Sequence, residues 1–499
     1  MSAEQTQPPL ARASPPWSED RVLATLTAAL GLFSLLLLLA TEAGAEDWLS
    51  PLAGLTAFAI LAGSLVTAAT LARKARRYLF LPVTSFLAAC GLYFGAGSLL
   101  HFFGSETELV ELNAIVKITP TGYARVMLLN AGTMSLVLGC YLLWRIALRP
   151  LLAQTGDDSE QPHSRRLDLV VLALAMVGLF VRFRFALAYE LKLAETPPTG
   201  LVIALTHFTY GAHYYFWEQV GRRERSRWPI IALLALDASY GAISLSKTAI
   251  FLPVLSAFLG YAAGRNLPLR KWLLALAAAV LIAIVLQPVN TYLRLGRALA
   301  PTLSVGDAVR GLQDGSLEDV VSLNNEGQLG TLWSRLAYAG DQLYCIEAYS
   351  RGERGTSYRY LVDMWIPRFL WRAKPLAVPG LEHARLTRGL DETYTSATLF
   401  GEAYFNAGFL GIAFFSLLLS AVLCLYEFPA RWVLQQRRTE YSVVLFSGIF
   451  VGLRVDDWAV MVAGAVVSSL GILVVMAIAA RWARTADLRT AYNSVGSGS

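Results

Sequence analysis

Residues 401–426, with the sequence GEAYFNAGFLGIAFFSLLLSAVLCLY, pass from a polar motif into a nearly uninterrupted apolar run. About 20 consecutive apolar residues are long enough to cross the hydrocarbon core of a bilayer as a helix. The whole chain of 499 residues is 55% hydrophobic and only 16% charged, which excludes a soluble globular protein. The sequence therefore predicts an all-α polytopic membrane protein.

Apolar windows of this length predict about twelve spanning helices. They lie at residues 22–40, 51–72, 79–103, 123–147, 168–190, 201–220, 229–245, 249–264, 272–291, 402–426, 442–455 and 459–482. The chain then divides into a flexible tail, nine helices, a long loop, three helices and a second tail, at residues 1–21, 22–291, 292–401, 402–482 and 483–499. Loops longer than about 15 residues are usually functional or disordered, and the helical spacing in this one favours function.

Clusters of Lys and Arg predict the orientation of the helices, because cytoplasmic loops carry an excess of basic residues. Six clusters fall on one side of the predicted bundle, at residues 73–77, 145–166, 222–225, 265–271, 437–438 and 481–484. Both termini are therefore expected in the cytoplasm and the long loop outside. The net charge of +6 says little by itself in a membrane protein, and we expect no nucleic-acid partner.

The second half of the long loop carries more basic than acidic residues. Only Asp363 and Glu382 oppose a set of six cations, namely Arg359, Arg368, Arg372, Lys374, Arg385 and Arg388. Arginine binds phosphate oxygens through a planar fork, so clustered arginines suit a diphosphate ligand. Arg294 and Arg297, at the start of the loop, join this candidate set. The alternative, left open, is that these cations contact lipid headgroups or pair with the acids of the loop.

Two local patterns predict structure within the loop. Pro367 and Pro375 each force the preceding residue towards an extended conformation, which predicts a rigid turn between them. From Gly330, apolar residues at helical spacing, including Leu343 and Ile346, predict an amphipathic helix lying on the outer membrane surface.

Glu402 begins the tenth predicted helix, beside this cationic loop. A carboxylate at the boundary between membrane and water suits a general base that accepts a proton from a hydroxyl group. The alternative is that Glu402 only stabilises the amino terminus of its helix. His383 and Glu382 are competing bases from the loop, and Tyr404 of the same motif is a candidate substrate contact.

A few charged residues fall inside predicted spans, where an ionisable group is a functional candidate. Arg182 and Arg184 lie in the fifth helix on different faces, so at most one points inward and the other reaches the interface. Asp237 of the seventh helix is expected to pair with one of them. Lys247 opens the eighth helix and predicts either a phosphate site or a simple hairpin turn. His213 is expected to take part in aromatic packing.

The sequence predicts neither a metal site nor a cofactor. The four cysteines (Cys90, Cys140, Cys345 and Cys424) are scattered, so we expect no disulfide and no thiolate cluster. The long loop has no Asp-x-Asp pair of the kind that can hold a divalent cation.

The segment Ile366-Pro367-Arg368 followed by Lys374-Pro375, together with the motif from Gly401 to Gly411, resembles the Wzy-type oligosaccharide repeat-unit polymerases of bacteria, within the GT-C superfamily. The helix count and the single large outer loop agree with that resemblance.

The resemblance implies a metal-independent glycosyltransferase in the bacterial cytoplasmic membrane. Its donor and acceptor would be undecaprenyl-diphosphate-linked glycans, its surroundings membrane lipids, and a chain-length regulator could bind it. Arg368 and Glu402 would be catalytic, with Arg372 and Lys374 at the diphosphate. The alternatives are an O-antigen-type ligase, a flippase or transporter for lipid-linked oligosaccharides, and a glycosyltransferase that uses a monosaccharide phospholipid.

Overall fold

The computed structural model describes most of the chain, and every regular element in the described part is a helix. The described residues are 17–74, 76–104, 109, 113, 115–148, 165–190, 200–244, 247–265, 267–268, 270–271, 274, 336–363, 366, 370–371, 374, 377–389, 395–436 and 443–496. The prediction of an all-α chain is confirmed for this part.

Seven helical stretches of the described part are long and apolar enough to cross a membrane. Five lie within single helices: Glu19–Glu42 in α1 (Trp17–Glu42), Glu46–Arg73 in α2 (Glu46–Lys74), Pro120–Ala147 in α6 (Pro120–Ala147), Thr398–Leu434 in α19 (Thr398–Gln436) and Ala459–Trp482 in α21 (Ala459–Gly496). The stretch Pro82–Phe103 runs through α3 (Pro82–Cys90), the π-helix η2 (Gly91–Ala96) and α4 (Leu100–Phe103). The stretch Arg165–Ala186 runs through α8 (Arg165–Val181) and the π-helix η3 (Arg182–Ala186). Each coincides with a predicted span, which supports a membrane protein.

Four further predicted spans are helices that do not meet those criteria. They are α10 (Gly200–Arg222), α11 (Trp228–Ser244), α12 (Lys247–Arg265) and α20 (Val443–Leu453). The predicted span at 272–291 lies outside the described residues. The count of about twelve therefore stays a prediction.

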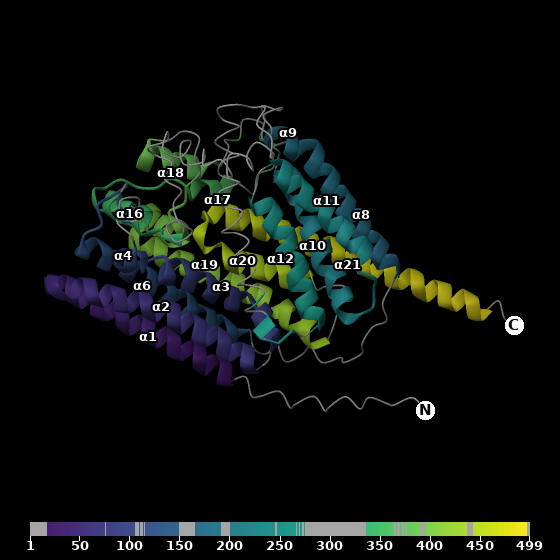
Figure 1. The fold of residues 1–499 in the computed structure, drawn as a ribbon, viewed down its shortest axis with the longest axis horizontal. Helices are drawn as coiled ribbons and strands as arrows, with labels where there is room; N and C mark the ends of the chain where they lie inside the picture. The colour runs from purple at the N-terminus through teal and green to yellow at the C-terminus, as the bar shows by residue number, and fades with distance from the viewer. Residues whose placement is uncertain are drawn as a thin grey trace, which may run out of the picture.

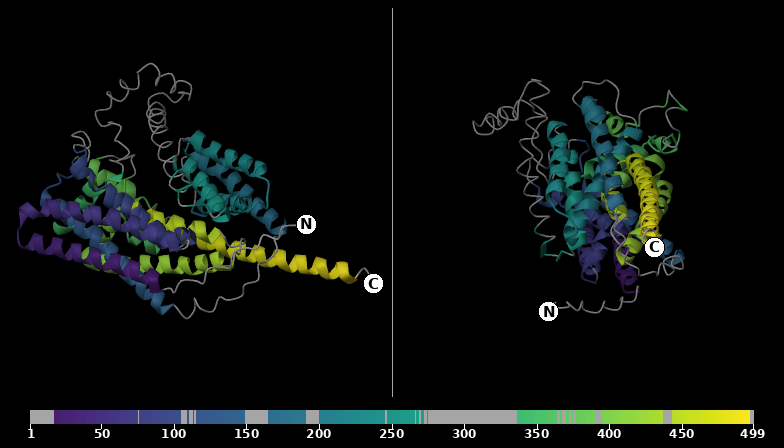
Figure 2. Two further views of the ribbon diagram at one scale, coloured as in Figure 1. Left: turned by 60° about the horizontal axis from the view of Figure 1, so that its bottom comes forward. Right: turned by 90° about the vertical axis from the view of Figure 1, so that its right-hand side faces the viewer.

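The helices pack as two adjoining groups (Figures 1 and 2). In the first group, α1 and α2 pack on α6, α6 packs on α19, and α3 packs on α20. In the second group, α10 packs between α8 and α12, and α11 covers α12. The two groups meet along α10, α20 and α21, and the end of α21 projects beyond both (Figure 1).

Buried charges join three helices at one end of the first group. Arg431 of α19 donates to Glu19 of α1 at 2.7 Å and to Glu427 at 2.5 Å. Arg145, at the end of α6, forms an ion pair with Asp20 at 2.7 Å and lies 3.5 Å from Glu19. These contacts place the start of α1 beside the end of α6 and the second half of α19. We refer to these five residues as the basal ion cluster.

The segment that precedes α19 folds over the opposite end of that helix (Figure 1). It contains α16 (Ala339–Ser350), α17 (Arg359–Asp363) and α18 (Pro379–Arg388). The predicted surface-lying helix was wrong in its packing, because Leu343 and Ile346 are buried between α16 and the helices α6 and α19. Apolar burial inside the protein outweighs contact with a headgroup region.

Replacing Arg431 with Met tests the basal ion cluster. The variant leaves Glu19 and Glu427 buried without their main cation, and removing one partner of a buried ion pair costs about 3–5 kcal/mol. We expect a clear fall in the thermal unfolding midpoint of the purified protein, measured by circular dichroism in detergent. Arg481→Met, at an exposed arginine of α21, is the control. Equal midpoints for the two variants would contradict the role of the cluster.

Candidate functional site

Glu402 is fully buried and joins three parts of the chain. One carboxylate oxygen accepts a hydrogen bond from the Ser357 hydroxyl at 2.5 Å. The other accepts a bond from the backbone N–H of Ala459, the first residue of α21, also at 2.5 Å. The carboxylate therefore caps an orphan donor at the start of one helix and anchors the loop before another. These contacts give Glu402 a structural role, and its role as a general base stays a prediction.

Asn406 extends this anchor by one helical turn. Its amide group donates to the Ser357 hydroxyl at 2.9 Å and to the Glu402 carbonyl at 2.8 Å. Its amide oxygen accepts from the Tyr358 backbone N–H at 3.3 Å, and Gly355 donates to the Phe405 carbonyl at 3.0 Å. The start of α19 is thus hydrogen-bonded to the segment 355–358 through both backbone and side-chain groups.

A sharp break follows at Ala407 and Gly408 within α19. Gly408 has φ +58° and ψ −138°, a backbone conformation that glycine adopts without strain and that other residues disfavour. A Cβ atom there would also lie 2.7 Å from the ring of Tyr349. The second glycine of the motif is therefore explained by the kink and by the close approach of α16.

A second buried network fixes α16 between two spanning helices. The Gln342 side chain donates to Asn130 of α6 at 2.8 Å and to Thr398 of α19 at 2.9 Å. Asn130 returns a bond to the Gln342 oxygen at 3.0 Å. Every polar atom of the two amide groups named here is used across these helices, which satisfies the requirement for buried polar groups.

Asp341, the neighbour of Gln342, brings α16 and α18 together. Its oxygens lie 2.9 Å from Nε2 of His383 and 3.2 Å from the guanidinium of Arg388. His383 is buried, with the rings of Tyr344 and Trp458 at 5.8 and 5.4 Å. Within the described residues Nδ1 of His383 has no hydrogen-bond partner. Trp458 was missed as part of this site, because nothing in the sequence near Asp457 signals contact with α18.

An exposed cluster of charges joins α17 and α18 through Tyr360, which is itself buried. Tyr360 donates to Glu382 at 2.5 Å, and Arg359 lies 3.6 Å from the same carboxylate. The Glu382 side chain is 41% exposed and that of Arg359 56% exposed. Burial and the bond to Glu382 raise the pKa of Tyr360, so its hydroxyl stays a donor at neutral pH. Of the three predicted bases, Glu382 is the accessible one.

The other described candidates have local contacts of their own. Arg385 is exposed on α18, beside Arg388. Lys374 donates to the Ile366 carbonyl at 3.0 Å, and its backbone N–H donates to the Trp371 carbonyl, so these bonds close a turn in the basic segment. Tyr404 packs edge-on against Tyr349, with ring centroids 5.2 Å apart.

Several predicted residues cannot be placed relative to this site. Arg294, Arg297, Arg368 and Arg372 lie outside the described residues. Lys247 begins α12, but its side chain also lies outside the described part. Their contacts with diphosphate stay predictions.

Arg182 lies far from the anchor, in a buried cluster of the second helix group. It pairs with Asp237, and its guanidinium also donates to the Thr206 carbonyl at 3.2 Å. The expected pairing of Asp237 with an arginine is confirmed, whereas Arg184 is exposed. His213, which was expected in aromatic packing, has its Nε2 3.1 Å from Asp237. Arg182 is buried with these partners, so a substrate contact there stays a prediction.

Within the described residues no group of three or more His, Cys, Asp or Glu side chains could hold a metal ion. The four cysteines are free thiols, and burial raises the pKa of Cys345 well above its ordinary value.

No protein-family model matches this chain, and no match was found among curated proteins or solved structures.

Gly408→Ala tests the kink of α19. The substitution combines a strained backbone, which costs about 1–3 kcal/mol, with the clash against Tyr349. We expect a lower thermal unfolding midpoint. Gly464→Ala, in a helical position of α21 with open space around it, should instead be stabilising by about 0.5–1 kcal/mol. A Gly408→Ala protein as stable as the Gly464→Ala protein would contradict the kink.

Glu402→Leu tests the anchor through the protease sensitivity of the loop. Arg351 and Arg354 are exposed trypsin sites next to the anchored segment. Loss of both hydrogen bonds should release that segment and speed cleavage there by about tenfold, if the bonds contribute about 1.4 kcal/mol together. Glu402→Gln should lie between that variant and the unmodified protein, and Glu347→Gln of α16 should cleave like the unmodified protein. Unchanged cleavage in Glu402→Leu would show that the contact is not an anchor.

Proposed function

We propose that this chain is an integral membrane glycosyltransferase of the Wzy type, which polymerises oligosaccharide repeats carried on undecaprenyl diphosphate. The observation that carries the proposal is the position of the exposed cluster. Arg359, Arg385 and Arg388 share a small folded segment with Glu382, and that segment is anchored to the end of a spanning helix. The diphosphate group of a membrane lipid would lie at the membrane surface, next to the end of that helix.

The chemistry of this cluster suits transfer from a diphosphate. The bond between the anomeric carbon of the growing chain and the diphosphate oxygen breaks, and the electron pair leaves with the lipid diphosphate. The acceptor hydroxyl forms the new bond and gives its proton to a carboxylate, for which Glu382 is accessible. Fixed guanidinium groups stabilise the charge that develops on the leaving group. Glu402 and His383 would act as positioning residues for α18 and the loop.

The finer topology belongs to the same proposal. We propose about twelve spans in the bacterial cytoplasmic membrane, with both termini in the cytoplasm and the α16–α18 segment outside. The basal ion cluster supports this arrangement, because it joins the start of α1, the end of α6 and the later part of α19. All three were predicted on the cytoplasmic side from the basic clusters.

The test uses a bacterial host that makes the glycan and lacks its own polymerase. Arg385→Ala and Glu382→Gln should each lower polymer formation by about 100-fold or more, the usual effect of losing a charge-stabilising or proton-transferring group. Lipid-linked single repeats should accumulate on the outer face. Glu353→Gln, an exposed carboxylate that pairs with Arg351 at 3.0 Å, is the matched control and should leave polymer unchanged.

The site of accumulation separates the alternatives. Repeats that collect on the cytoplasmic face would favour a transporter. Polymer that forms normally but stays on its carrier would favour a ligase. Normal polymer on its final acceptor in both variants would overturn the proposed site, provided that membrane levels of the protein are unchanged.

A further inference from the structure

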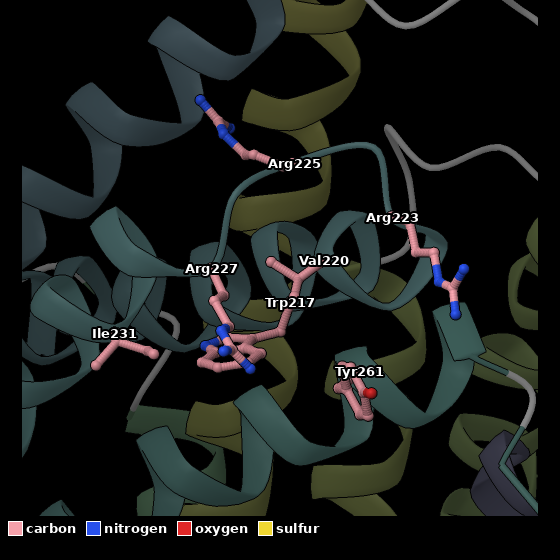
Figure 3. Close-up of a pocket in the computed structure, with 7 residues that line it drawn as sticks. All are labelled: Trp217, Val220, Arg223, Arg225, Arg227, Ile231 and Tyr261. Carbon is pink, nitrogen blue, oxygen red and sulfur yellow. The ribbon is translucent and has the colours of Figure 1, made fainter.

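A basic cavity of about 530 Å³ opens in the second helix group, away from the α16–α18 segment. It lies between the end of α10, the start of α11 and the last turns of α12 (Figure 3). Its lining consists of Trp217, Val220, Arg223, Arg225, Arg227, Ile231 and Tyr261. None of these residues takes part in the proposed transfer reaction.

Two of the three arginines face the cavity without an ion-pair partner in the described part of the chain. Arg223 and Arg227 lie on opposite sides of the cavity, and both are exposed (Figure 3). Arg225 instead points towards α8 (Figure 3), where its guanidinium lies 3.3 Å from Asp168 and 4.7 Å from the ring of Phe216. Two guanidinium groups without an ion-pair partner among the described residues therefore flank one concave surface, and that of Arg227 also lies 5.3 Å from the ring centre of Trp228.

The backbone of the α10–α11 turn supports a specific placement of Arg223. This residue has φ +65°, in the left-handed region that a non-glycine residue seldom occupies. Glycine or asparagine usually stands at this position after a helix. The local acids do not neutralise the cavity, because Glu224 is exposed outside the lining and Glu218 is paired with Arg222 at 2.7 Å.

The walls of the cavity continue into an apolar face. Trp217 and Tyr261 form an aromatic pair with centroids 6.3 Å apart, a composition typical of the headgroup level of a membrane. Ile231 both lines the cavity and is 37% exposed, and Trp228 and Leu236 are exposed along the same helix. Apolar side chains exposed on a membrane helix contact acyl chains. A ligand here can thus place its anionic group between the two arginines and lay its hydrocarbon tail along α11.

We propose that this cavity binds the phosphate group of an anionic phospholipid in the leaflet that faces this end of the bundle. Arginine forks bind phosphate oxygens bidentately, and basic pockets between membrane helices are suited to anionic headgroups. A free phosphorylated metabolite would offer the same anion but would not use the apolar face of α11.

The test compares lipid retention by the full-length protein and two variants. The protein is placed in nanodiscs of phosphatidylcholine with a minor fraction of phosphatidylglycerol, and bound lipids are counted by native mass spectrometry after release. The double variant Arg223→Gln/Arg227→Gln should bind phosphatidylglycerol about thirtyfold more weakly, given the usual contribution of each of the two basic residues near a membrane surface. Arg270→Gln removes an exposed arginine that does not line the cavity, and it should bind like the unmodified protein.

A second arm separates the two sources of phosphate. Glycerol phosphate is titrated against the protein in nanodiscs of phosphatidylcholine alone, with thermal stability as the measurement. No stabilisation by glycerol phosphate, together with loss of phosphatidylglycerol only in the double variant, supports the lipid site. Stabilisation by glycerol phosphate without any preference for phosphatidylglycerol would overturn the lipid as occupant. Equal lipid retention by the double variant and Arg270→Gln would overturn the site itself.

Discussion

The buried carboxylate of Glu402 is the contact on which the arrangement of the α16–α18 segment depends. A carboxylate without exposure is costly unless its oxygens are satisfied, and here Ser357 and the first N–H of α21 satisfy them. The two bonds hold a loop and a helix start against one turn of α19. Asn406 and the kink at Gly408 take part in the same contact between α19 and the preceding segment. The residues 401–408 therefore have a structural role in packing.

The same constraint governs the other buried charges. The basal ion cluster joins α1, α6 and α19 at one end, and the pair of Arg182 with Asp237 joins η3 and α11 in the second helix group. An unpaired charge inside the protein is strongly destabilising, so each of these buried charges needs a partner of opposite sign. In both clusters that partner comes from another helix. Each cluster thereby specifies which helices are neighbours, a choice that apolar faces alone leave open.

Around the start of α19, the residues that hold the structure differ from those that carry the proposed chemistry. Glu402, Gln342 and His383 are buried and hold helices in place. Glu382 and the arginines of α17 and α18 remain exposed and carry the proposed chemistry. The basic cavity beside α10 is separate, because its lining comes from α10, α11, α12 and the turn between α10 and α11, and includes no residue of this segment.

Hydropathy and glycine content are local properties, so the helical class, the seven long apolar stretches and the importance of the segment around 401–408 could be predicted from the amino-acid sequence. It also predicted that Asp237 pairs with Arg182 or Arg184, since few charges fall inside apolar windows, and the fold selects Arg182. Three further features were visible only in the folded chain: Glu402 is an anchor, α16 is buried, and Trp458 lies beside His383. Those outcomes depend on contacts between distant residues, such as Glu19 with Arg431, 412 positions apart, and pairing over such distances is set by three-dimensional packing and the cost of burying charge.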